Sequence, residues 1–208
     1  AVVLLFSIVF GNAQTPIHPK APTNPNAIRI LHSDFIDKNQ NEIPGAIVFT
    51  GNVQVQHNGV LINCNKAYHY TDEDYIKAFG NVQLNQGDTI VMNSRYAEYD
   101  GKTLQAFATG NVNLRSPDSN LTTDTIYFDR NKQEASFKSW GTIVNKENTL
   151  KSKFGKYNIK SKKYSFKTAV TVVNPQVTIK TNNLDFYDNS GHAYVYGPST
   201  ITSKENVI

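Results

Sequence analysis

The chain has 208 residues, and its 21 Lys and Arg against 17 Asp and Glu give a formal net charge of +4. This excess of positive charge is too small to indicate a nucleic-acid partner. Eleven Tyr and eleven Phe beside a single Trp favour strands, because aromatic residues pack well on a pleated surface. A single cysteine, Cys64, excludes an intramolecular disulfide, so we interpret it as a small core residue.

Residues 1–13 form an uncharged apolar run that ends in small residues. The run is shorter than the roughly 20 residues that a membrane-spanning helix needs, and it is typical of the hydrophobic part of a signal peptide. We interpret it as a signal-peptide remnant, with a buried strand or helix as the alternative. The prolines that follow make residues 14–27 a Pro-rich linker. The sequence therefore predicts export to the periplasm, either free there or associated with the outer membrane.

A five-residue phrase of the form Gly-Asn-Val-x-x recurs through the rest of the chain. Full and weaker versions of the phrase begin at Gly51, Gly80, Gly110, Gly141, Val170 and Gly197. The successive spacings are 29, 30, 31, 29 and 27 residues. A period in this range is typical of stacked supersecondary units, each of which buries its apolar face against the next.

Apolar residues alternate with polar ones across each phrase, as in Ile76, Ala78, Gly80, Val82 and Leu84. Successive strand side chains point to opposite faces, so this parity lines a common interior. No sustained helical apolar stripe is present, and we expect almost no helix. A glycine inside a strand weakens it and often marks a bend. Each long strand is therefore expected to bend at its glycine into a facing sheet, although the glycines could instead end strands at hairpin turns.

These patterns predict an all-β fold of stacked antiparallel rungs, with a repeat of about 30 residues, around an apolar trough. The residues expected to line the trough are Val53, Val55, Ile76, Val82, Leu84, Leu104, Val112, Leu114, Phe137, Ile143, Phe166 and Val172.

The motifs Ala78-Phe79-Gly80-Asn81-Val82 and Ala108-Thr109-Gly110-Asn111-Val112, with Asp124-Thr125-Ile126-Tyr127-Phe128-Asp129 between phrases, resemble the OstA-like (LptA-type) lipopolysaccharide-transport family. The resemblance covers residues 28–208 and implies a twisted open β-jellyroll, or β-taco. It also implies that acyl chains of lipopolysaccharide or a related glycolipid lie in the interior. Copies of the chain, or other β-jellyroll transport proteins, are expected to stack end to end. The sequence departs from the family pattern where the phrase degrades after Gly141. Because the chain also stops at Ile208, just after a fresh phrase strand, we expect a domain truncated at its C-terminus.

Known catalytic patterns are absent from the sequence. The five histidines have no metal-ligand spacing, and there is no nucleophile elbow, phosphate-binding loop or dinucleotide fingerprint. We therefore expect no catalytic residue, no metal site and no cofactor. Together with the apolar trough, the resemblance to the OstA-like family implies a non-enzymatic lipid carrier. Two alternatives stay open: a structural or adhesive exported β-solenoid with a dry core, and a carbohydrate-active enzyme with paired carboxylates.

Lysines crowd residues 146–167, where Glu147 is the only acid. They could simply form a solvated sheet surface with protected edges. The functional interpretation is a patch that attracts anionic lipid headgroups or an acidic partner. The residues of this expected headgroup patch are Lys151, Lys153, Lys156, Lys160, Lys162 and Lys163.

Overall fold

The computed structural model describes residues 27–87, 89–187 and 189–203, and this part of the chain contains fifteen strands and no helix. The signal-peptide remnant, all but one residue of the linker and residues 204–208 lie outside the described residues. Within the described ranges no helix is long and apolar enough to cross a membrane. The strands are β1 (Arg29–His32), β2 (Phe35–Asp37), β3 (Ala46–His57), β4 (Val60–Tyr70), β5 (Tyr75–Gln86), β6 (Ile90–Asp100), β7 (Gln105–Arg115), β8 (Asn120–Asp129), β9 (Glu134–Phe137), β10 (Gly141–Asn145), β11 (Asn148–Ser152), β12 (Phe154–Asn158), β13 (Lys163–Val173), β14 (Val177–Tyr187) and β15 (His192–Ser203).

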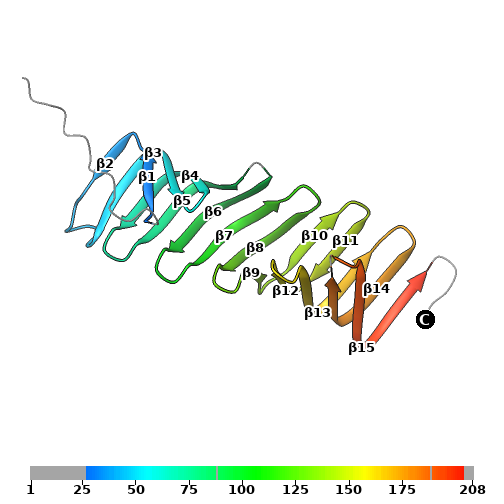
Figure 1. Cartoon of the computed structure of the whole chain (residues 1–208). Helices are drawn as coiled ribbons and strands as arrows, with labels where there is room; N and C mark the ends of the chain where they lie inside the picture. The colour runs from blue at the N-terminus through cyan, green and yellow to red at the C-terminus, as the bar shows by residue number, and fades with distance from the viewer. Residues whose placement is uncertain (1–26, 88, 188, 204–208) are drawn as a thin grey trace, which may run out of the picture.

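The strands form one elongated antiparallel array that follows the order of the chain (Figure 1). From β3 to β8, each strand pairs with its neighbours in sequence. The first half of β8 pairs with β10 and its second half with β9, so β9 and β10 together replace one long strand. In the same way, β11 and β12 pair with the two halves of β13. The array begins at β1 and β2 and ends at β15, as expected for stacked antiparallel rungs.

Strands β3, β5 and β7 continue through their phrase glycines. At Gly51–Asn52, Gly80–Asn81 and Gly110–Asn111, two residues face one residue of a neighbouring strand, which defines a β-bulge. All six residues have positive φ, between 46° and 83°. Glycine adopts this region freely and asparagine tolerates it, which explains why the phrase joins Gly to Asn. The interpretation that these glycines end strands at hairpin turns is therefore wrong.

The bulges fold each long strand in two, and the half-strands form two facing sheets. Tyr99 lies in the same cross-strand row as Ile47, ten residues before His57 on β3. In a flat strand that separation corresponds to about 33 Å. The ring centroids of His57 and Tyr99 are nevertheless 5.0 Å apart. The two halves must therefore lie face to face, with the core between them.

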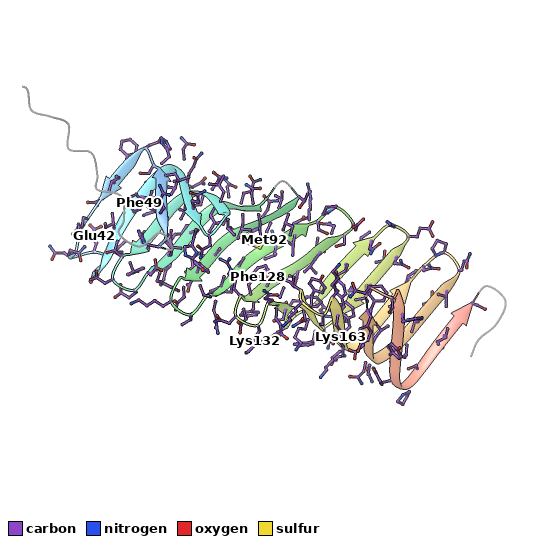
Figure 2. The ribbon with its side chains drawn as sticks, viewed as in Figure 1. Glu42, Phe49, Met92, Phe128, Lys132 and Lys163 are labelled. Atoms are coloured by element: carbon purple, nitrogen blue, oxygen red, sulfur yellow. The ribbon has the colours of Figure 1, made fainter. Side chains whose placement is uncertain are left out.

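We call the sheet that contains Ile76 and Ala78 the first sheet, and the sheet that contains Val82 and Leu84 the second sheet. Their inward side chains form three successive core clusters along the array. In the middle cluster, Met92 of the second sheet packs with Phe128 of the first, and Figure 2 labels both near the centre of the array. The core thus extends along the whole length of the fold.

In the later units, the bend precedes the weak phrase by two residues. Thr123 pairs with Val112 on one side and with Gly141 on the other, so Gly141 corresponds to Val112 and not to Gly110. The bends of these units lie at Ser139–Trp140 and Thr168–Ala169. Bends therefore start at residues 51, 80, 110, 139, 168 and 197, with spacings of 29, 30, 29, 29 and 29. The sequence-based starts at Gly141 and Val170 are wrong by two residues, which leaves the parity unchanged.

Gly141 is a glycine because of packing. In the units that bend at Gly80 and Gly110, an alanine before the bend is followed four residues later by a valine, as in Ala108 and Val112. Here Phe137 takes the alanine position and Gly141 the valine position. A Cβ on Gly141 would lie 2.5 Å from the Phe137 ring, and a Cβ on Gly155 would be closer still. A large ring beside two glycines thus replaces the small-large pair within a close-packed core.

A small polar residue is buried opposite each bend, on the strand between two phrases. These residues are Cys64, Ser94, Thr123, Ser152 and Thr181, all between 0 and 8% exposed. Each donates a hydrogen bond to a backbone carbonyl beside the bend, for example Ser152 Oγ to Phe154 O at 3.0 Å. Because a buried carbonyl needs a partner, these side chains satisfy acceptors where the strand ladder is broken. Burial raises the pKa of the Cys64 thiol, which agrees with a core role.

Candidate functional site

The inward side chains of the second sheet form a continuous apolar row, which we call the interior ladder. Each member is the register partner of the next, and together they cross eleven strands without a polar interruption. At about 4.8 Å per strand, the row extends for roughly 48 Å. Its members are Val55, Ile62, Leu84, Met92, Leu114, Leu121, Ile143, Leu150, Val172, Ile179 and Ile201.

The interior ladder differs from the rest of the core in its exposure. Val55 and Met92 are buried, but the other members are only partly buried although they face inward. By contrast, the row next to the bend is closed, and its valines Val53, Val82, Val112 and Val170 are 0–1% exposed. The fold therefore has a dry core at the bend and a partly accessible apolar surface farther from it.

The residues predicted to line the trough fall into three groups. Six of them belong to the closed core and are 0–3% exposed: Val53, Ile76, Val82, Val112, Phe137 and Phe166. Five belong to the interior ladder: Val55, Leu84, Leu114, Ile143 and Val172.

Leu104, the last predicted trough residue, does not lie in a strand. It ends the turn before β7 and has a positive φ of 58°. A carboxylate oxygen of Asp100 accepts the N–H groups of Lys102 and Thr103, both at 2.8 Å. These hydrogen bonds form an Asx-type turn, which holds the backbone between β6 and β7 in a turn conformation up to Leu104. The alternating pattern, which gives Leu104 the same parity as Ala106 and Ala108 and so extends the strand to Leu104, is therefore wrong at this residue.

Sequence reasoning missed the ladder residues on the strands between phrases, namely Ile62, Met92, Leu121, Leu150, Ile179 and Ile201. Two of these strands begin with consecutive apolar residues, Val60-Leu61-Ile62 and Ile90-Val91-Met92, so alternation does not show which side chain points inward. A second periodic pattern in the sequence marks most of these inward residues. All but Ile201 lie two residues before a buried Cys, Ser or Thr opposite a bend.

The lysines of the expected headgroup patch lie at three separate places. The amines of Lys151 and Lys153 lie over the ring of Trp140, at 5.0 and 5.6 Å from its centroid. Lys156 pairs with Glu134 at 3.1 Å, and Lys163 pairs with Asp185 at 2.8 Å, which raises the pKa of Lys163.

Lys160 and Lys162 occupy the turn between β12 and β13. Both are exposed, and neither forms an ion pair within the described part of the chain. The sequence grouped these six lysines because they are close along the chain. The bend separates Lys151 and Lys153, which lie beside Trp140, from the other four, which lie on the first sheet or in its turn.

Groups with altered pKa values do not converge on one cleft. Burial lowers the pKa of His69, partly offset by Asp74, and His69 lies on the inner side of β4. Burial also raises the pKa of Glu98, which accepts a hydrogen bond from the Tyr96 hydroxyl on β6. Among the described residues no three His, Cys, Asp or Glu side chains are placed to hold a metal ion. The feature that distinguishes this interior is therefore an apolar surface.

Comparison with known proteins agrees with the geometry. A family model described as OstA-like protein matches residues 25–182, which is most of the chain. The structure is similar to the crystal structure of LptH, the LptA homologous periplasmic component of the lipopolysaccharide transport device from Pseudomonas aeruginosa. The TM-score is 0.50 at 14% identity, and the match covers 55% of this chain and 94% of LptH. The likeness confirms the all-β jellyroll fold. No curated protein matches the chain.

Proposed function

The chain belongs to the OstA-like family, and from this premise we propose that it is a non-enzymatic carrier in lipopolysaccharide transport. Its cargo is lipopolysaccharide or a related glycolipid, whose acyl chains lie along the interior ladder. The observation that carries the proposal is that the ladder is continuous and apolar over eleven strands and partly accessible at every member except Val55 and Met92. Burial of each acyl CH₂ group contributes about 0.8 kcal/mol, so affinity needs no specific polar contact along the chains.

The glycolipid headgroup stays at the long side of the array opposite the bends, where the hairpin turns of the two sheets lie. Lys160 and Lys162 project from a turn at the edge of the first sheet and attract its phosphates. Figure 2 labels Lys132 and Lys163 along the same long edge, where each is paired with an aspartate. The exposed turn lysines, rather than all six lysines of the segment, therefore provide the headgroup contact.

The carrier acts in the periplasm and passes its cargo toward the outer membrane. Among the described strands, β15 pairs with β14 alone, and β1 and β2 pair with β3 alone. Such open edges can pair with another chain. A second copy, or another β-jellyroll transport protein, extends the ladder by stacking end to end, which is a head-to-tail contact that does not close.

Substitutions in the ladder test this proposal. We expect the double variant Leu84→Asn, Leu114→Asn to bind purified lipopolysaccharide at least tenfold more weakly, measured by displacement of an environment-sensitive apolar dye. The control variant Asn113→Gln changes the opposite face of β7 and leaves binding unchanged. Circular dichroism and the unfolding midpoint show that each variant is folded. Unchanged affinity in the folded double variant would favour the alternative, a structural β-solenoid whose interior stays dry.

A further inference from the structure

A second candidate site lies outside the core, at the bend of the C-terminal half. It is a hollow of about 580 Å³ that spans several adjacent strands. Lys151, Thr171, Lys180 and Thr200 line it as successive register partners on β11, β13, β14 and β15. Along each strand these residues alternate with members of the interior ladder, so they point to the opposite side of the second sheet. The lysines and threonines of this row therefore lie outside the interior, and the buried residues Val170 and Thr181 border the hollow at the bend.

Trp140 forms one wall of the hollow. It is the single tryptophan of the chain, and it is 46% exposed. It occupies the second bend position, where the earlier units have Asn52, Asn81 and Asn111. Asparagine suits a solvated bend, whereas an exposed indole leaves apolar area in water. The bend itself gives no reason for a large aromatic ring here.

The outer row that leads to this hollow contains no carboxylate. In register order it consists of Gln54, Asn63, Gln83, Asn93, Asn113, Thr122, Thr142, Lys151, Thr171, Lys180 and Thr200. Its side chains are amides and hydroxyls, and its two charges are the lysines that line the hollow. Lys153 adds a third cation beside the indole ring. This part of the surface is therefore polar and positive, with no acid in the row to neutralise it.

These groups fit an acidic sugar. An indole ring stacks on the C–H face of a pyranose, and hydroxyl and amide groups pair with sugar hydroxyls. Lysine amines attract phosphate or carboxylate oxygens in charge-assisted hydrogen bonds. The hollow offers Trp140 for stacking, Thr171 and Asn182 for hydrogen bonding, and Lys151 and Lys180 for the charge. Its volume lies in the range of about 300–1,000 Å³ that small-molecule sites have.

We propose that the hollow beside Trp140 binds an acidic saccharide, that is, a glycan unit that carries a phosphate or a carboxylate. The site faces away from the interior ladder, so it can be occupied while lipid is bound inside. The outer face then contacts a charged glycan independently of the cargo. This inference does not depend on what the interior binds.

The fluorescence of Trp140 reports on this site directly, because the chain has no other tryptophan. Tetragalacturonate and mannose 6-phosphate serve as carboxylated and phosphorylated probes. We expect at least one of them to change the emission in a saturable way and to bind more weakly as salt is added. The double variant Lys151→Gln, Lys180→Gln is expected to lower its affinity at least tenfold. The matched variant Lys66→Gln, Lys77→Gln removes two lysines that also lie over aromatic rings, and it leaves the affinity unchanged.

Four results would overturn the proposal. Equal binding of neutral maltotetraose would remove the role of charge, and an equal response to inorganic phosphate would reduce the site to an anion contact. A response to phosphatidylglycerol vesicles but to neither saccharide would make the surface a membrane contact instead.

Saturation-transfer NMR on the saccharide that responds extends the test to Trp140→Ala and Trp140→Phe. Binding should be lost in the first variant and largely kept in the second, and full binding by folded Trp140→Ala would also contradict the proposal.

Discussion

The aromatic ring of Phe137 lies against the Cα of Gly141, across the bend between β9 and β10, and leaves no room for a Cβ there. Gly155 on β12 borders the same ring from the neighbouring strand. One large side chain therefore fills the space that an alanine and a valine share in the units that bend at Gly80 and Gly110. This exchange keeps the interior close-packed where the repeat changes its sequence.

Replacing Gly141 with alanine should destabilise the fold. The new Cβ would lie 2.5 Å from the Phe137 ring, and overpacking of this kind typically costs about 1–3 kcal/mol. Urea unfolding followed by circular dichroism measures the loss. The double variant Phe137→Leu, Gly141→Ala should recover part of the stability, because the smaller side chain makes room for the methyl group. A double variant less stable than Gly141→Ala alone would show that the ring is not the source of the strain.

Replacing Ser152 with alanine should also destabilise the fold. Ser152 is 0% exposed, and its hydroxyl donates to the carbonyl of Phe154 at 3.0 Å. Leaving a buried acceptor without its partner costs about 1–3 kcal/mol. Ser152→Thr should cost less, because Thr123 and Thr181 hold equivalent positions. The outward variant Thr142→Ala is the control, and an equal loss in both alanine variants would show that the buried hydroxyl has no special role.

Stability should fall as the pH drops below about 6.5, partly because of His69. Burial lowers the pKa of His69 in the folded state, so the unfolded chain takes up a proton first as the pH falls. The contribution of His69 is therefore complete above the unfolded pKa and is lost between that value and the lower folded pKa. The urea midpoint at pH 7.5 and pH 5.5 should differ less for His69→Gln than for the unmodified chain. His192→Gln changes an exposed histidine and should keep the full difference; an unaltered pH difference in His69→Gln would contradict this role.

Much of the fold follows from local patterns. Gly-Asn pairs predict the bends at residues 51, 80 and 110 because few other residues accept a positive φ. The next two bends carry Ser139–Trp140 and Thr168–Ala169, which have no such preference, and the last begins again with a glycine, Gly197. Gly141 resembles a phrase glycine in the sequence, but it lies two residues after the bend and is a glycine because the Phe137 ring leaves no room for a Cβ. Local pattern alone cannot separate a glycine needed for conformation from one needed for space.

The candidate site was only partly predictable. Parity identifies which side chains face inward, as for Leu84 and Leu114. It does not say how exposed an inward residue is: Val112 beside the bend is sealed and Leu114 is partly accessible, whereas Met92, in the same row as Leu114, is buried. The six lysines of the expected headgroup patch are close along the chain but do not form one patch, because Lys151 and Lys163 lie on either side of a bend.

A photo-crosslinking amino acid placed at Leu114 or at Asn113 tests the central claim most directly. The two residues are neighbours on β7, both are partly exposed, and they point to opposite faces of the second sheet. With lipopolysaccharide present, irradiation should give a protein–lipid adduct from position 114 and little or none from position 113. Equal labelling at the two positions would contradict an interior lipid site.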